Sequence, residues 1–395
     1  MKRARGLLLV ILLGLTFLPL PAAAATGIEI ISDSATVAFP AGIEFRLHVR
    51  SDTVIQDIRL QYRVERREYI NIVAETFLEL VPGREQDVRW VWDMRQTGEL
   101  PPGAVVEYWW LVITEGGEVN KTDPVALNVN DERYDWRRIE GGNIAINWYR
   151  GDEDFARQML EAAGAALARL EDATGAVPRG IIEFYIYGSG QEVQGAMVFS
   201  SEWTGGVAYA RYGIITLGIG PGDLAWGSRA IAHELSHLVV HEMTDNPYSG
   251  VPVWLNEGLS MMTEGPLEFT FSSLLSQAIS NDSLDSVRTL ASPFSAFTDQ
   301  SLLAYAESYS IVNYLVATYG PDMMSRLLGA FSQGSTYDDA LMGVYGLDMD
   351  TLDRAWRKYL GLGEIPGSRV GAASSVHEER GEPGRQVVAP FMLPV

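Results

Sequence analysis

Two histidines four residues apart carry the clearest chemistry in this sequence. His233 and His237 flank Glu234 in the order His-Glu-Leu-Ser-His. On an α-helix, positions i and i+4 project from one face about a turn apart, so both imidazoles can reach one metal ion. Glu234 lies beside them, within reach of a water molecule at that ion. The pattern indicates a zinc site that performs hydrolysis.

The surrounding sequence predicts the helix that this spacing requires. Asp223 can cap its start, and the Asp-Asn-Pro run at 245–247 ends it after about five turns. Its apolar stripe consists of Ile231, Leu235, Leu238 and Val239.

A third metal ligand is expected from a second helix that begins near Trp254. Glu257 lies in that helix, with 19 residues between it and His237, and is expected to face the first helix. Together with His233, these two residues make three protein ligands, which leave the fourth position of a tetrahedral zinc ion for water. That arrangement is typical of catalytic rather than structural zinc sites.

The other three histidines have ordinary interpretations. His48 alternates outward on an expected strand, and His377 lies in a polar segment. His241 follows His237 by one turn, which is too far along the helix axis to share a metal with His233. We interpret His241 as solvated or as a neighbour of a ligand.

The motif resembles that of the gluzincin metallopeptidases, most closely their extracytoplasmic peptidase MA-like families. The resemblance rests on HELSH followed by WLNEGLS. It implies that His233, His237 and Glu257 bind Zn²⁺, that Glu234 is the general base, and that the substrate is a peptide or protein. It also implies a thermolysin-like domain with a mixed sheet and a helical lobe.

Two departures from related patterns limit what this resemblance implies. Thermolysin-like enzymes use an aspartate four residues after the zinc glutamate to orient a histidine, and Met261 stands there. Ser260 and Glu264 are the candidates for that role. Aminopeptidase N-like relatives carry Gly-x-Met-Glu-Asn, but here Val198 follows the Gly-Ala-Met at 195–197. This counts against that aminopeptidase mechanism.

Residues 1–25 are typical of a secretory signal peptide. Basic residues precede an apolar run from Leu7 to Leu20, and small residues follow Pro21. No later stretch has the length to cross a bilayer. We expect a soluble mature chain that is extracytoplasmic, secreted or periplasmic. The chain has no cysteine, so it has neither disulfides nor a lipid-anchored cysteine.

The expected mature chain is strongly acidic. Removing residues 1–25, which hold three basic and no acidic residues, takes the formal net charge from −21 to −24. Such a surface disfavours nucleic acid and anionic membranes as partners. We interpret this net charge as serving solubility, with attraction of basic substrates as the alternative. Because the charged residues are interspersed, no acidic tail is implied.

Residues 26–130 predict strands only. Phe45, Leu47 and Val49 alternate with polar neighbours, and about seven short runs are separated by turn signals. The pattern predicts an immunoglobulin-like β-sandwich. The region contains two tryptophan pairs, Trp90 with Trp92 and Trp109 with Trp110. We interpret them as packing residues, with a carbohydrate-binding platform as the alternative.

Residues 131–362 are expected to form the metallopeptidase domain, with the sheet and metal helices at 139–265 and a helical lobe at 266–362. A charged link at 131–138 leads into it, and a flexible tail at 363–395 follows it. Strands are expected at 144–148 and 182–186, and a hairpin at 205–218. In the family, the strand nearest the metal pairs with extended substrate, so one strand of this hairpin is a candidate for β-augmentation.

A tyrosine is the remaining candidate for catalysis. Tyr305 lies in LLAYAESYSIVNYL, which is similar to the segment after the zinc helices in peptidase MA-like proteins. The resemblance implies that Tyr305 donates to the oxyanion, with Tyr309 one turn on and plain packing as alternatives.

Two hypotheses of function follow. The first is a secreted zinc metallopeptidase that uses a zinc-activated water and Glu234. The second is a non-catalytic extracellular binding protein, in which the sandwich recognises a partner and the zinc fold is a scaffold.

Overall fold

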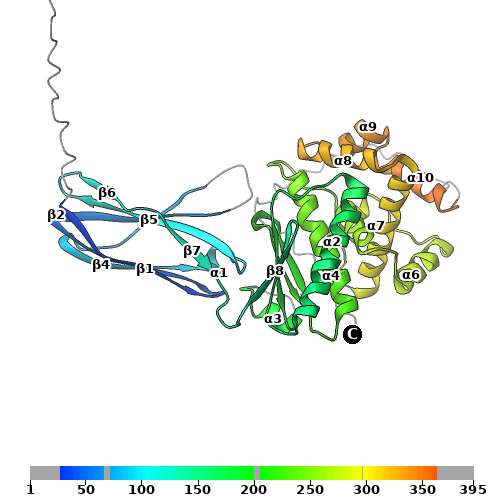
Figure 1. Ribbon diagram of the computed structural model, residues 1–395. Helices are drawn as coiled ribbons and strands as arrows, with labels where there is room; N and C mark the ends of the chain where they lie inside the picture. Colours follow the sequence, from blue (N-terminus) through cyan, green and yellow to red (C-terminus); the bar gives the residue numbers. More distant parts are fainter. Residues whose placement is uncertain (1–26, 66–71, 200–204, 296, 363–395) are drawn as a thin grey trace, which may run out of the picture.

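The computed structural model describes residues 27–65, 72–199, 205–295 and 297–362, which form two parts joined end to end (Figure 1). An elongated β region is followed by a larger part in which helices cover a sheet. The expected signal peptide and tail, with His377, lie outside the described residues.

Within the described residues, seven antiparallel strands form the N-terminal region. They are β1 (Ile28–Ala38), β2 (Gly42–Val64), β3 (Ala74–Phe77), β4 (Gly83–Asp93), β5 (Ala104–Thr114), β6 (Val119–Lys121) and β7 (Val125–Val129), with the short helix α1 (Met94–Thr97). The first half of β2 pairs with β1 and β4, and its second half pairs with β3 and β5. Phe45, Leu47 and Val49 alternate into the core and are fully buried. The antiparallel β region is as predicted, and the finer immunoglobulin-like assignment stays a prediction.

The tryptophans of this region contribute packing. Trp92 and Trp110 are buried. The ring of Trp90 lies 5.8 Å from that of Phe45. Trp109 is 5% exposed, and the Nζ of Lys121 lies 4.6 Å from its ring centre. These contacts agree with the packing interpretation.

A five-stranded mixed sheet forms one layer of the second part, in the order β11-β12-β10-β9-β8. The strands are β8 (Arg137–Gly141), β9 (Ile144–Trp148), β10 (Ile182–Tyr187), β11 (Gly206–Tyr209) and β12 (Ile214–Gly218). β9, β10 and β12 are parallel, whereas β8 and β11 are antiparallel strands at the two edges. The expectation of a plain charged link at 131–138 is wrong at its end, because Arg137 and Arg138 already belong to β8. An edge strand with exposed, charged side chains lacks the apolar alternation that marks a strand.

Three helices hold the centre of this part: α2 (Glu153–Thr174), α4 (Leu224–Thr244) and α5 (Val253–Glu264). Asp152 caps α2, because its carboxylate accepts a hydrogen bond from the amide of Phe155 at 2.9 Å. Asp223 precedes α4 as expected, but its side chain makes no capping hydrogen bond. Contacts with α2, α5 and β11 surround α4, so burial rather than a cap fixes this helix.

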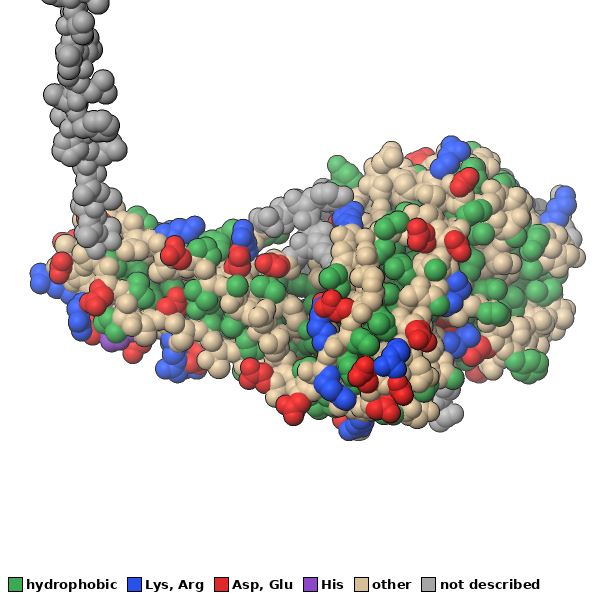
Figure 2. Space-filling view, in the orientation of Figure 1, with side chains coloured by type: hydrophobic (Ala, Val, Ile, Leu, Met, Phe, Trp, Pro, Cys, Tyr) green, Lys and Arg blue, Asp and Glu red, His purple; other side chains and the backbone are tan. Residues whose placement is uncertain are grey.

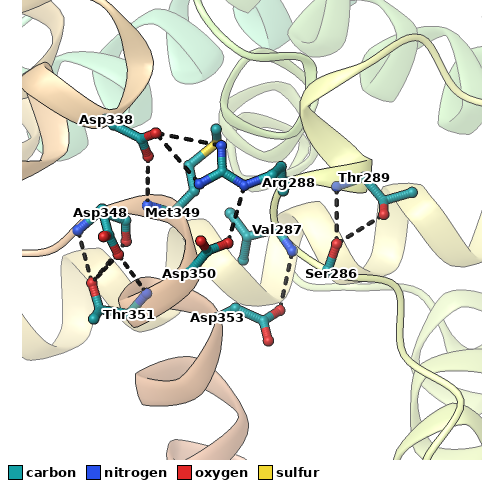
Figure 3. A network of polar contacts seen from close by, with 10 residues as sticks. All are labelled: Ser286, Val287, Arg288, Thr289, Asp338, Asp348, Met349, Asp350, Thr351 and Asp353. Carbon is teal, nitrogen blue, oxygen red and sulfur yellow. Dashed lines mark hydrogen bonds and ion pairs between the residues drawn. The ribbon is translucent and has the colours of Figure 1, made fainter. Parts of the chain in front are cut away.

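A helical lobe completes the chain: α6 (Phe269–Ser280), α7 (Thr298–Tyr319), α8 (Pro321–Ser332), α9 (Tyr337–Tyr345) and α10 (Met349–Tyr359). Figure 3 shows the polar network that joins its parts. Arg288, in the segment after α6, contacts Asp338 of α9 and Asp350 of α10. Asp338 also accepts a hydrogen bond from the amide of Met349 at 2.9 Å. The network fixes the segment after α6 against the last two helices.

On the face seen in Figure 2, acidic and basic side chains are interspersed over both parts. Among the described residues, none of the helices is long and apolar enough to cross a membrane.

Candidate metal centre

Helix α4 buries the histidine pair and the glutamate between them. His233, Glu234 and His237 are 1%, 2% and 9% exposed. A polar side chain is rarely buried this deeply without a partner, because losing water costs free energy that only a new contact restores. The burial of three such groups in adjacent turns therefore indicates a site.

Helix α5 supplies the third candidate ligand. It packs against α4 on one side and α7 on the other. Gly258 permits the contact with α7, because a side chain there would overlap the backbone oxygen of Ser308. Glu257 precedes Gly258. Its side chain is therefore buried, with 3% of the residue exposed, and it contacts His233 and His237 of α4.

His233, His237 and Glu257 converge on one point. The Oε2 of Glu257 lies 3.4 Å from the Nε2 of His233 and 3.5 Å from the Nε2 of His237. One potential ligand atom from each residue lies within 4.8 Å of the others. Among the described residues, the buried Nε2 of His237 and Oε2 of Glu257 have no hydrogen-bond partner. Two imidazole nitrogens and a carboxylate oxygen arranged in this way fit Zn²⁺.

The Nδ1 atom of each histidine, on the side of the ring away from the candidate metal position, contacts a polar side chain of α5. The Nδ1 of His233 lies 2.8 Å from the Oε1 of Glu264, at the end of α5. The Nδ1 of His237 lies 3.1 Å from the hydroxyl of Ser260. Arg229 in turn forms an ion pair with Glu264 at 2.8 Å. Both candidates for the role that Met261 leaves open thus contact a histidine, and such contacts fix the orientation of a ligand.

Burial and neighbouring charges shift the pKa values of this cluster. Burial raises the pKa of Glu234 to about 7, against the opposing effect of His233. Burial disfavours the charged form of His233, but Glu257 and Glu264 outweigh it and raise its pKa to about 10. Burial lowers the pKa of His237. Glu234 can therefore take up and release a proton near neutral pH.

The structure brings Tyr305 to the same site. Its ring centre lies 6.2 Å from that of His233. Burial, followed by the charges of Glu257 and Glu234, raises the pKa of Tyr305 well above its ordinary value. The hydroxyl is therefore protonated at neutral pH and can donate a hydrogen bond. Tyr309 lies one turn further along α7.

A cavity of about 340 Å³ opens beside the candidate ligands. One wall is α4, from Glu234 to Thr244, and the others include β11 with the short helix η1 (Ala210–Tyr212) and the first turns of α5. His241, interpreted from sequence as solvated or a neighbour of a ligand, lines this cavity, as do Asn256 and Arg211. His241 lies outside the metal-binding group, as expected. The helical spacing of four residues from His237 was the signal that could have placed it on this wall.

Fold and site together define a zinc metallopeptidase of the HExxH type with a downstream glutamate. The chain belongs to the Peptidase MA superfamily, whose family model matches residues 162–361. No curated protein sequence gives a match.

Solved structures resemble the chain only weakly. The aminopeptidase A of Legionella pneumophila, solved with aspartic acid, is 11% identical to this chain and has a TM-score of 0.34. The match covers 84% of this chain and 50% of the aminopeptidase. Catalytically inactive OgpA of Akkermansia muciniphila, solved with an O-glycopeptide, is 9% identical over 27% of this chain, with a TM-score of 0.21. This chain spans 30% of the length of OgpA.

Proposed function

We propose that this chain is an extracytoplasmic zinc metallopeptidase that hydrolyses peptide bonds with Glu234 as general base. The convergence of His233, His237 and Glu257 beside a buried glutamate, on the wall of a cavity, is the observation that carries this proposal. Residues 1–25, with the features of a signal peptide, support the extracytoplasmic location.

His233, His237 and Glu257 would hold the zinc ion. When bound, zinc acts as a Lewis acid toward the scissile carbonyl and lowers the pKa of water at the site. Glu234 accepts the proton of the attacking water at a carboxylate oxygen, and then returns it to the leaving amine. Burial of the Glu234 side chain raises its pKa and so favours uptake of this proton.

Tyr305 and β11 have separate roles in this proposal. The Tyr305 hydroxyl donates a hydrogen bond to the oxygen that becomes negatively charged as water attacks. β11 is an edge strand that lines the cavity with Val207 and Ala208, so an extended peptide can pair with it along the cleft. The substrate is accordingly a peptide or an unfolded segment of a protein.

A peptide library tests this function directly. The purified chain is incubated with diverse peptides, with and without a chelator, and products are identified by mass spectrometry. Cleavage that chelation abolishes supports the peptidase. One bound zinc per chain without cleavage of any peptide supports the non-catalytic binding protein instead.

Replacing the proposed base provides the sharper test. In Glu234→Gln, the zinc content should equal that of the wild type, because none of the three proposed ligands is changed. The kcat should fall by about 10²- to 10⁴-fold or more, because the amide cannot accept the proton. Metal content is measured by atomic absorption on the same samples. A kcat close to the wild-type value would exclude Glu234 as the base.

A further inference from the structure

The N-terminal β region touches the second part at the strand that lines the cavity. Val198 and Tyr212, which precede and follow β11, pack against the hydrophobic core of the β region. In the opposite direction, Phe39 of the β region packs against the cluster that contains Tyr209. The contact between the two parts therefore involves β11 and the residues on either side of it.

One side chain of the β region makes two hydrogen bonds across this contact. Glu99 lies between α1 and β5. Its Oε1 accepts a hydrogen bond from the hydroxyl of Tyr209 at 2.9 Å, and its Oε2 accepts one from the amide of Val198 at 2.6 Å. A charged acceptor makes the stronger kind of hydrogen bond. Glu99 thus binds both Val198, which precedes β11, and Tyr209, the last residue of β11.

The partner of Glu99 is itself fully enclosed. Tyr209 is 2% exposed. Burial, followed by the charge of Glu99, raises the pKa of Tyr209 well above its ordinary value, so its hydroxyl stays protonated and donates. If this bond is lost, a buried hydroxyl and a carboxylate must each find another partner or remain unsatisfied. The link between the two parts is therefore costly to break.

β11 connects this link to the proposed base. Ala208 precedes Tyr209, and its backbone forms a hydrogen bond with Glu234. Ala208 also lines the cavity. Consecutive residues share a rigid peptide plane, so a shift of Tyr209 moves Ala208 as well. The β region and Glu234 thus contact adjacent residues of one strand.

We propose that the N-terminal β region is required for substrate binding by the peptidase site, because Glu99 holds β11 in the position in which this strand pairs with an extended peptide. Glu99 is a positioning residue that acts through Tyr209 and Val198. The inference rests on the proposed peptidase function and adds that substrate binding requires the β region.

Two variants of the full chain test this inference, each with a matched control. Glu99→Gln keeps only one acceptor oxygen, so Val198 and Tyr209 can no longer both donate to it, and Tyr209→Phe loses the donor to Glu99. Glu107→Gln and Tyr108→Phe remove groups of the same kind whose partners, Arg63 and Asp33, lie within the β region. Zinc content and the circular dichroism spectrum establish that every variant is folded.

Amide hydrogen exchange measures how readily β11 opens locally, and it does not depend on enzymatic activity. Amides of 205–212 should exchange about tenfold faster in Glu99→Gln and Tyr209→Phe, because local opening becomes easier when a buried hydrogen bond is lost. The double variant should exchange no faster than the quicker single variant, because once the Tyr209 hydroxyl is absent, the one oxygen that Glu99→Gln retains can accept from Val198. Equal exchange in the variants and in both controls would overturn the proposal.

Steady-state kinetics then measures the effect on the substrate. With a peptide that the wild type cleaves, KM should rise about tenfold in both variants while kcat changes less, because zinc and its ligands are intact. Faster exchange of β11 with an unchanged KM would refute the role in substrate binding. If the wild type cleaves no peptide, the peptidase function and this role fail together, and the exchange rates alone decide whether Glu99 holds β11.

Discussion

Glu264 shows how this site orients its first histidine without the aspartate of thermolysin-like enzymes. It lies seven residues after Glu257, so it reaches His233 from the last turn of α5 instead of the turn that carries Met261. Arg229 holds its other oxygen at 2.8 Å. The carboxylate is 3% exposed at its side chain, and water therefore competes weakly for these contacts.

We predict that Glu264→Gln weakens zinc binding. The amide keeps an acceptor for His233 but loses the ion pair with Arg229, so the imidazole is held less firmly. Loss of such an outer contact typically weakens metal binding about 10- to 100-fold. Zinc affinity is measured by competition with a chromophoric chelator.

Glu268→Gln is the control for this change. Glu268 also contacts Arg229, at 3.2 Å, but its side chain is 52% exposed. Its replacement should leave zinc affinity within about twofold, because surface ion pairs contribute little. Equal losses in the two variants would show that Arg229, and not the contact with His233, sets the affinity.

For individual residues of the site, the sequence predicts those contacts that depend on the geometry of a single helix or motif. The convergence of His233 and His237 follows from the rise of one helix, and Glu257 follows from a motif in the next helix. The contact of Glu264 with His233 depends on how closely α4 and α5 pack, which the spacing of residues does not state. Ser260 and Glu264 could therefore be named as candidates but not assigned to a particular histidine.

The packing of α5 against α7 positions Glu257, and it depends on one glycine. A Cβ at Gly258 would overlap the carbonyl oxygen of Ser308 and a methyl group of Val312. Val312 is fully buried and Ser308 contributes backbone, so neither can move cheaply. Gly258 therefore sets the distance between the two helices.

Gly258→Ala should destabilise the chain and reduce its activity. Overpacking of a close helix contact typically costs about 1–3 kcal/mol of unfolding free energy. A displaced α5 would also move Glu257 away from the histidines. Urea denaturation and zinc content measure the two effects on the same preparation.

Gly164→Ala provides the matched control on α2. Gly164 is exposed, and a Cβ there would meet nothing within 4 Å. Alanine should stabilise this helix by about 0.4–1 kcal/mol, because it lowers the conformational entropy of the unfolded chain. The two glycine substitutions should therefore have opposite signs. Stabilisation by Gly258→Ala would contradict the close contact with α7.

Among the elements, strongly periodic segments were predictable and edge elements were not. β9 and β12 are buried along their whole length, and β10 alternates between buried and partly buried residues, as their largely apolar sequences indicate. β8 pairs through its backbone with β9, while Arg138 bonds Glu183 across the sheet at 2.7 Å. Its charged residues resemble a linker because nothing in them marks a buried face.

At the scale of the whole molecule, the two parts meet through residues far apart in the sequence. Glu99 and Tyr209 are separated by 110 positions. Each lies in a segment with an ordinary local pattern, and only the fold reveals their contact. A prediction from the sequence could thus describe the β region and the metallopeptidase part separately, but not the strand through which they meet.

The helical lobe contains a buried acid whose charge opposes folding. Glu307 of α7 is fully buried. Its Oε1 accepts a hydrogen bond from the amide of Asp285 at 2.9 Å, whereas its Oε2 has no hydrogen-bond partner among the described residues. Burial raises its pKa from 4.5 to about 8. The protonated form is therefore the one that the folded chain retains at neutral pH.

The raised pKa fixes the sign of a pH dependence. Between pH 4.5 and about 8, the unfolded chain releases the proton of Glu307 and the folded chain keeps it. The folded state then binds more protons, so this group lowers the unfolding free energy as the pH rises, by up to about 1.4 kcal/mol per unit. The contribution is fully present below pH 4.5 and is lost as the pH passes through about 8.

Glu307→Gln should remove this dependence, because an amide does not titrate. The unfolding free energy of the variant relative to the wild type should rise by about 3 kcal/mol between pH 5 and pH 8. Urea denaturation at four pH values measures the difference, in which the titration of all other groups cancels. Glu161→Gln, on the exposed face of α2, is the control for the same change of side chain outside the core. A constant difference for Glu307→Gln would mean that the folded chain carries Glu307 ionised, which requires a cation or water beside its Oε2.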